Sequence, residues 1–339
     1  MVARPEVSKP CLAASVFALA LCLGACGGSD DSSSTATTVT PTPSPTPTAT
    51  PTPTPTATGT AYSTASVDCP YSGTYTGTYS TSGTLSASWN WSCSGTTRSM
   101  TGTGLPDHAV GTFPNSNNPN AIASQSISAS MTAAPTLTTT ATSVNYAGYM
   151  RNSVKIEAAT NATCPSSATG TSQCSADGGG YAWKVEALGQ SVFSLGLDSN
   201  NAHVQPGGVY HYHGVPEGLL TNAGVSDSNR KMLLVGWALD GFPIYARYCY
   251  TTATDASSAV KKCASSYVLD TTADTDRPST SWFPLGTFTS DYSYVAGSGD
   301  LDECNGRTGV TPEFPDGIYY YVVTDEFPFM GRCVKGSTS

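Results

Sequence analysis

Short runs in which apolar and polar residues alternate dominate the chain beyond residue 60. In the segment 71–93, aromatic and aliphatic residues are spaced among Gly, Ser and Thr, a pattern typical of β-hairpins. Clusters of Gly, Pro, Asn and Asp separate the later runs. These runs are the predicted strands of the domain: 143–150, 153–158, 180–187, 209–213, 232–238, 243–250 and 317–324.

No long stretch repeats its apolar residues at helical spacing. The predicted fold is therefore mainly β, a sandwich- or barrel-like domain with long disulfide-pinned loops that follows a disordered Thr/Pro stalk. We expect a lipoprotein signal peptide over 1–25, a lipidated Cys and linker over 26–60, and the main domain over 101–339. The segment 61–100 is predicted to be a β-hairpin segment, either a small appendage or the first strands of the main sheet.

The amino-terminal segment has the features of an export signal. Arg4 and Lys9 precede an apolar run over 12–23, which is shorter than the roughly 20 residues of a membrane-spanning helix. The run ends in Leu-Gly-Ala-Cys26, which resembles the lipobox of bacterial lipoproteins. That resemblance implies that Cys26 is lipidated and anchors the chain to a membrane. Gly27, in place of Asp, implies the outer membrane, on its periplasmic or cell-surface side, and the alternative is an ordinary signal peptide.

Residues 35–58 are almost wholly Thr, Pro, Ala and Ser. Such a segment has too little apolar surface to fold, and its Pro-Thr repeats favour extended polyproline II. We expect it to be a stalk between the anchor and the domain.

Composition excludes several classes of function. The net charge is −9 and no basic patch is present, so nucleic acid is not an expected partner. No glycine loop typical of phosphate binding precedes a helix, so a nucleotide is not expected either. A Gly-x-Ser-x-Gly hydrolase elbow with a later histidine is also lacking, because every histidine precedes residue 214.

Eight cysteines follow the signal segment, an even number that indicates four disulfides in an oxidising compartment. The absence of a Cys-x-x-Cys pair disfavours the alternative, a cysteine-rich metal site. Eight cysteines allow 105 connectivities, and we predict pairing between neighbours in sequence. The predicted pairs are Cys69–Cys93, Cys164–Cys174, Cys249–Cys263 and Cys304–Cys333.

Three of the four histidines lie within eleven residues of one another. His211 and His213 are two residues apart in a predicted strand, so their side chains share a face, whereas Tyr210 and Tyr212 point to the other face. The Pro-Gly-Gly turn at 206–208 could fold His203 back as a third ligand. Imidazole clusters suit copper, zinc, iron or nickel, and we favour copper, with zinc as the alternative. The competing interpretation is that the histidines are structural and bond to backbone or carboxylates.

The segment Tyr210-His-Tyr-His213-Gly-Val-Pro is the signature for which the YHYH domain family is named, and the chain resembles that family over about 104–336. Further similar blocks are Gly-Leu-Pro-Asp-His at 104–108, Leu-Asp-Ser-Asn-Asn-Ala-His at 197–203, Gly-Trp-Ala-Leu-Asp-Gly-Phe-Pro at 236–243 and Leu-Asp-Glu-Cys-Asn-Gly at 301–306. The resemblance implies no established activity. It does place His108 in a family block, which makes His108 a fourth candidate metal ligand.

A second segment of the chain resembles the signature. Gly-Val-Tyr-His-Tyr-His at 208–213 is matched by Gly-Ile-Tyr-Tyr-Tyr-Val at 317–322. The two strands are predicted either to pair or to occupy equivalent places in a duplicated sheet. Only the first has histidines, so only the first is a candidate metal site.

Acidic residues supply candidate bases. Asp240 follows an apolar strand, and Glu303 lies beside Cys304, where a disulfide would hold it in place. Alternatively, such residues cap turns. Three functions remain open: a metal-binding surface lipoprotein, a metal-dependent exported hydrolase or oxidase, and an adhesion module that uses exposed Tyr and Trp to bind a glycan or protein.

Overall fold

The computed structural model describes residues 61–176 and 178–338, and the predictions for the signal segment, Cys26 and the stalk lie outside these residues. The described chain is mainly β, as predicted, and its sheets are open rather than closed into a barrel. Its one α-helix is α1 (Glu217–Asn222), and three 3-10 turns span Ser80–Ser82, Thr171–Gln173 and Thr289–Asp291. No helix in this part of the chain has the length and apolar character needed to span a membrane.

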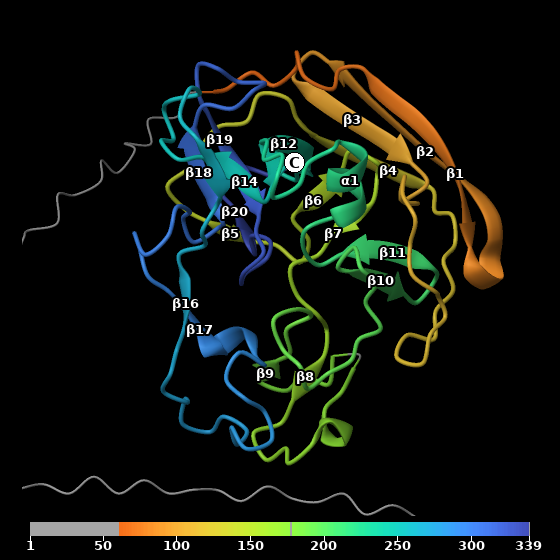
Figure 1. Ribbon diagram of the computed structural model, residues 1–339, viewed down its shortest axis with the longest axis vertical. Helices are drawn as coiled ribbons and strands as arrows, with labels where there is room; N and C mark the ends of the chain where they lie inside the picture. Colours follow the sequence, from red (N-terminus) through yellow and green to blue (C-terminus); the bar gives the residue numbers. More distant parts are fainter. Residues whose placement is uncertain (1–60, 177, 339) are drawn as a thin grey trace, which may run out of the picture. The chain divides into compact units, whose positions relative to one another are not determined.

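The largest sheet of the described residues has eight strands in the order β10-β11-β7-β6-β12-β13-β19-β18 (Figure 1). Neighbouring strands are antiparallel except for two parallel pairs, β7 with β11 and β13 with β19. The strands are β6 (Gly148–Met150), β7 (Lys155–Ile156), β10 (Ala202–Gln205), β11 (Val209–Tyr212), β12 (Leu233–Ala238), β13 (Pro243–Ala246), β18 (Gly306–Gly309) and β19 (Ile318–Val323).

This sheet consists of two halves with the same topology. The first half is the hairpin β6–β7 followed by the hairpin β10–β11, and the second half is β12–β13 followed by β18–β19. In each half the last strand pairs in parallel with the second strand of the first hairpin. The halves meet where β6 pairs with β12. The two strands with similar sequences, β11 and β19, therefore do not pair but occupy equivalent places in a duplicated sheet. This is the second of the two predicted arrangements.

Hydrogen bonds confirm the equivalence side chain by side chain. Tyr210 donates to Asp198 at 2.8 Å, and Tyr319, its counterpart, donates to Asp302 at 2.9 Å. The register agrees as well. Tyr212 lies opposite Ala202, and its counterpart Tyr321 lies in the same way opposite Gly306. Applied along the strands, this register matches the three histidines 203, 211 and 213 with Arg307, Tyr320 and Val322.

The segment ahead of the duplicated sheet forms a four-stranded antiparallel sheet, drawn in orange and yellow in Figure 1. Its strands are β1 (Tyr71–Tyr79), β2 (Gly83–Ser94), β3 (Thr97–Gly102) and β4 (Ile127–Thr132), so they lie on both sides of residue 100. The inner face packs on the first hairpin turn of the larger sheet. Trp91 donates to the carbonyl of Arg151 at 2.9 Å, and the Gly104 amide donates to Ser153. One hydrophobic core therefore spans both sheets.

Smaller sheets and disulfides organise the long loops. The two-stranded sheets pair β5 (Thr142–Ser143) with β20 (Cys333–Val334), β8 (Thr163–Cys164) with β9 (Trp183–Lys184), β14 (Tyr248–Tyr250) with β15 (Val260–Lys262), and β16 (Tyr267–Leu269) with β17 (Tyr292–Tyr294). All four predicted disulfides are confirmed: Cys69–Cys93, Cys164–Cys174, Cys249–Cys263 and Cys304–Cys333. A second hydrophobic cluster, around Trp183, Phe283 and Phe288, lies among these loops.

The predicted strands exist, but several are shorter than predicted. The run 143–150 is split between β5 and β6, and the run 180–187 contributes only β9. The run 243–250 is divided into β13 and β14 because Arg247 between them has a left-handed φ of 62°. Alternation in sequence marks these segments correctly, but it does not reveal where the backbone leaves the sheet.

Candidate metal centre

Two of the histidines are brought together by the β10–β11 hairpin. His203 lies directly opposite His211, so both imidazoles leave the sheet on the same face. In the connecting turn Gly207 and Gly208 have φ values of 85° and 82°, which glycine adopts without strain. The turn therefore folds His203 back beside His211, as the sequence predicts.

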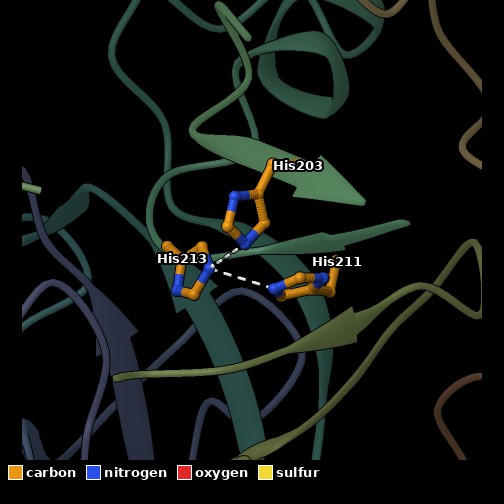
Figure 2. Close-up of side chains that lie close together, drawn as sticks. All are labelled: His203, His211 and His213. Atoms are coloured by element: carbon orange, nitrogen blue, oxygen red, sulfur yellow. Dashed lines mark hydrogen bonds between the residues drawn. The ribbon is translucent and has the colours of Figure 1, made fainter. Parts of the chain in front are cut away.

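His213 completes the cluster. It follows the last residue of β11 and lies two positions beyond His211, so it projects to the same side. The Nε2 atoms of His211 and His213 are 3.0 Å apart, and those of His213 and His203 are 3.1 Å apart. Figure 2 shows the three rings pointing these nitrogens toward one another.

The outer nitrogens of two rings are held by backbone carbonyls. The Nδ1 atom of His203 lies 2.8 Å from the carbonyl oxygen of Leu195, and that of His211 lies 3.3 Å from the carbonyl oxygen of Val209. A neutral imidazole has one N–H, so a ring that donates from Nδ1 presents a lone pair at Nε2. Backbone acceptors of this kind orient metal-binding histidines in proteins.

Burial keeps the cluster in the form that binds metals. His211 and His213 are each 1% exposed, and His203 is half-buried. Burial lowers the pKa of all three imidazoles, most strongly for His211 and His213. Metal ligation requires the neutral ring, which this environment favours.

The spacing of the nitrogens suits one small cation. Three nitrogens about 2.0 Å from a single ion are about 3.3–3.5 Å apart at tetrahedral or trigonal angles. The observed separations of 3.0 and 3.1 Å are close to these values. Rings that present lone pairs at these nitrogens would stabilise a positive charge placed between them. The cluster is therefore chemically suited to a transition-metal ion.

Comparison with known protein families matches residues 128–336 to the family described as YHYH protein. The match covers more than half of the chain. This chain belongs to the YHYH family. No curated protein and no solved structure matches it.

The YHYH signature, residues 210–213, divides its side chains between two tasks. Tyr210 and Tyr212 are buried in the core, where they hydrogen-bond to Asp198 and Asn152. His211 and His213 lie on the opposite face and, with His203, form a cluster that could hold a metal ion. Strand alternation alone predicted this division.

His108, the fourth candidate ligand, is not part of the cluster. Its Nε2 lies 2.6 Å from the hydroxyl of Tyr212, and its Nδ1 lies 2.9 Å from the carbonyl of Ala109. Because Tyr212 projects from the face of β11 opposite to His211, the sheet separates His108 from the other histidines. The predicted four-histidine site is thus reduced to three, and His108 supports the YHYH strand from its core side.

The two candidate bases also lie elsewhere. Asp240 is fully buried and accepts hydrogen bonds from the Tyr321 hydroxyl and the Gly336 amide, at 2.6 and 2.8 Å. Glu303 pairs with Lys335 at 2.6 Å. Asp240 holds the hairpin turn of the second half, and burial raises its pKa. Both residues have structural partners, in keeping with the alternative interpretation of each.

Glu157, which the sequence does not single out, is the carboxylate beside the cluster. It follows β7, whose parallel pairing with β11 places Lys155 next to His211. One oxygen of Glu157 lies 3.6 Å from the Nε2 of His211 and accepts from Gln205 at 2.7 Å, and the other pairs with Lys155. The nearest sequence signal, the Lys-Ile-Glu segment 155–157, is too common to identify a site.

A second cluster of potential ligands has a different explanation. Cys249, Cys263 and Asp300 lie close together in the described chain. The two cysteines form a disulfide, and Asp300 pairs with Lys261 at 2.7 Å. Without free thiolates this group is a cross-linked loop and not a metal site.

Proposed function

We propose that this YHYH protein binds one transition-metal ion through His203, His211 and His213, and that it captures or handles that ion outside the cytoplasm. The observation that carries the proposal is the convergence of three Nε2 atoms, two of them from fully buried histidines, at 3.0 and 3.1 Å. Copper is the leading candidate because its divalent ion has the highest affinity for nitrogen ligands in the first-row series, and zinc is the alternative.

The second half of the sheet supports a functional rather than a structural role for the histidines. It builds the same hairpins in the same register with Arg307, Tyr320 and Val322 at the equivalent positions. The fold thus forms without imidazoles at these places. Histidines that the fold does not require, gathered with their nitrogens facing inward, support ligand binding.

We propose binding rather than turnover. A metal-dependent hydrolase or oxidase needs an open coordination position and, for hydrolysis, a base near the bound water. Asp240 and Glu303 are engaged with Tyr321 and Lys335, away from the cluster, and Glu157, the carboxylate beside the cluster, is paired with Lys155 and Gln205. Turnover of an exported substrate therefore remains the second form of this proposal, to be tested once a metal is found.

We also propose that the chain is an exported lipoprotein, anchored in the outer membrane through Cys26. The lipobox-like sequence at 23–26 supports the anchor. The four disulfides support an oxidising compartment, because cytosolic proteins rarely keep such bonds. Labelling cells with a radioactive fatty acid tests this part, since a Cys26→Ser variant should lose the label.

The experiment for the metal site uses the full chain, purified from the cell envelope and analysed by elemental mass spectrometry. We expect close to one copper or zinc per chain, and none in a double His211→Ala, His213→Ala variant that keeps its β-sheet circular dichroism. His108→Gln is the matched control, because it removes a histidine outside the cluster and should retain the metal. A parent chain that stays metal-free after reconstitution with copper and zinc contradicts the proposal.

A different surface favours a second candidate function, the binding of a neutral glycan. Every exposed residue within strands β1–β4 is Ser, Thr or Asn. A shallow groove of about 590 Å³ crosses this face, lined by hydroxyl and amide side chains of residues such as Ser88, Asn90, Thr101 and Ser128. Such a surface offers hydrogen bonds without charge, as neutral sugars require.

This candidate differs from the adhesion module expected from the sequence. That hypothesis uses exposed Tyr and Trp, and the exposed aromatic residues of the described chain, Tyr181, Trp282 and Tyr294, lie outside strands β1–β4. Pull-down with insoluble neutral polysaccharides tests the hydroxyl face. We expect Thr101→Lys to abolish retention while Lys261→Thr, a distant surface change, does not, and a parent chain that is not retained contradicts the candidate.

A further inference from the structure

The carboxylate of Glu157 is held at the edge of the histidine cluster by two polar neighbours. Lys155 pairs with one oxygen, and the amide of Gln205 donates to the other at 2.7 Å. That second oxygen lies 3.6 Å from the Nε2 of His211. The side chain is 15% exposed, so this negative charge is largely withdrawn from water and lies beside the converging imidazoles.

The duplicated sheet shows that this arrangement belongs to the site and not to the scaffold. The parallel pairings match Ile156 with Ile244, and therefore Lys155 with Pro243 and Glu157 with Tyr245. The second half thus lacks the acid and the lysine where it lacks the histidines. The three histidines, Glu157 and Lys155 are therefore present together in the first half and absent together from the second.

Resting on the metal site proposed above, we propose that Glu157 is the fourth protein ligand of the ion. A tetrahedral ion with ligands at about 2.0–2.2 Å sets neighbouring donor atoms about 3.3–3.5 Å apart. The distance of 3.6 Å from Glu157 to His211 is already near this value. To coordinate the same ion, this oxygen would also have to approach His203 and His213, and Glu157 would exchange its bond to Gln205 for the ion.

The fourth ligand determines which charge state of the ion the site prefers. Three neutral imidazoles bind a monovalent and a divalent ion without adding charge. One carboxylate in a poorly hydrated site attracts a divalent ion more strongly than a monovalent one. A site of three histidines and Glu157 therefore favours Zn²⁺ or Cu²⁺ over Cu⁺, for which three nitrogens already suffice.

The test measures the affinity of the full chain for Zn²⁺ and for Cu⁺, each by competition with a chelator of known affinity. We expect Glu157→Gln to weaken Zn²⁺ binding by at least about tenfold and Cu⁺ binding by less than about threefold. Glu303→Gln is the matched control, because it also removes a carboxylate paired with a lysine, and it should change neither affinity.

Three results overturn this proposal. Unchanged Zn²⁺ affinity in Glu157→Gln shows that the carboxylate is not a ligand. Equal weakening of both ions shows that Glu157 only supports the shape of the cluster. A parent chain that binds neither ion overturns the three-histidine site as well, whereas the first two results leave that site intact.

Discussion

The two halves of the large sheet have the same strand arrangement and differ in the residues on one of its two faces. In both, a tyrosine on the last strand donates to the aspartate of a Leu-Asp pair, and a second tyrosine bonds to the first hairpin turn. Those turn partners are Asn152 in the first half and Asp240 in the second, with hydrogen bonds of 3.0 and 2.6 Å. The turns continue with Ser153 and Gly241, both at positive φ.

The difference between the halves lies on the other face. The first half places three imidazoles and Glu157 together there, whereas the second half has an arginine bonded to a tyrosine, Arg307 to Tyr320 at 2.6 Å. Tyrosines that face the core are common to both, so they account for the fold. The comparison thus separates, within one chain, the residues that build the sheet from the residues that are available for function.

The largest difference is expected when the side chains at the equivalent positions 211 and 320 are each replaced by phenylalanine. His211→Phe should lower metal affinity by more than about hundredfold, because it removes a ligand rather than an outer partner. Tyr320→Phe should leave metal affinity unchanged and cost about 1–2 kcal/mol of unfolding free energy through its lost bond to Arg307. Competition with a chelator measures the metal affinity, and urea unfolding measures the unfolding free energy. Equal loss of metal affinity in both variants would contradict the assignment of the metal site to the first half.

Exchange of the positive-φ residues of the two hairpin turns, Gly241 and Ser153, should change the unfolding free energy by different amounts. A Cβ at Gly241 would lie 2.0 Å from the carbonyl oxygen of Thr132, so Gly241→Ser should cost about 3 kcal/mol of unfolding free energy. Ser153→Gly loses only the hydrogen bond to Gly104 and relieves the positive φ, so its cost should stay below about 1 kcal/mol. Comparable losses in urea unfolding would show that the turns are not packed differently.

Asp240 and Asn152 occupy equivalent positions in the two turns, but neither should tolerate replacement by the other. Asp240→Asn should cost about 2 kcal/mol, because an amide oxygen that accepts from Tyr321 and Gly336 turns its NH2 group toward the Phe242 backbone N–H, which now donates to the other carboxylate oxygen. Asn152→Asp should cost a similar amount, because it sets a carboxylate beside the Asp107 oxygen, now 2.9 Å from the Asn152 amide. Unfolding free energies near the parent value would contradict the assigned hydrogen bonds.

The smallest difference is expected at the equivalent left-handed residues Asn201 and Asn305. Asn305 is fully buried and donates to Val322 and Thr324, whereas Asn201 is half-buried and donates to Val215 alone. Alanine at 305 should therefore cost about 2 kcal/mol and alanine at 201 about 1 kcal/mol. The reverse order in thermal unfolding would show that burial does not set the cost.

Local rules predicted the centre of the site. Strand alternation put His211 and His213 on one face, and a Pro-Gly-Gly turn put His203 beside them, because both depend only on neighbours in sequence. The four disulfides were predictable for the same reason, since each closes a short loop. The mainly β fold followed from short alternating runs without helical spacing.

Residues that reach the site through long-range pairing were not predictable. Glu157 lies beside the histidines because β7 pairs in parallel with a strand more than fifty residues later, and no local pattern specifies that pairing. His108 was misplaced because its motif gave no information about which face of β11 it would contact. The sequences of β11 and β19 are similar, but only the register of their strand pairing showed which residues correspond.

X-ray absorption at the edge of the bound metal, recorded on the purified full chain, tests most directly whether the first half of the sheet is a histidine metal site. We predict the multiple-scattering pattern of three imidazoles with nitrogen at about 2.0 Å from the ion. A spectrum with fewer than three imidazoles, or with sulfur ligands, would contradict the assignment of His203, His211 and His213 as the metal centre.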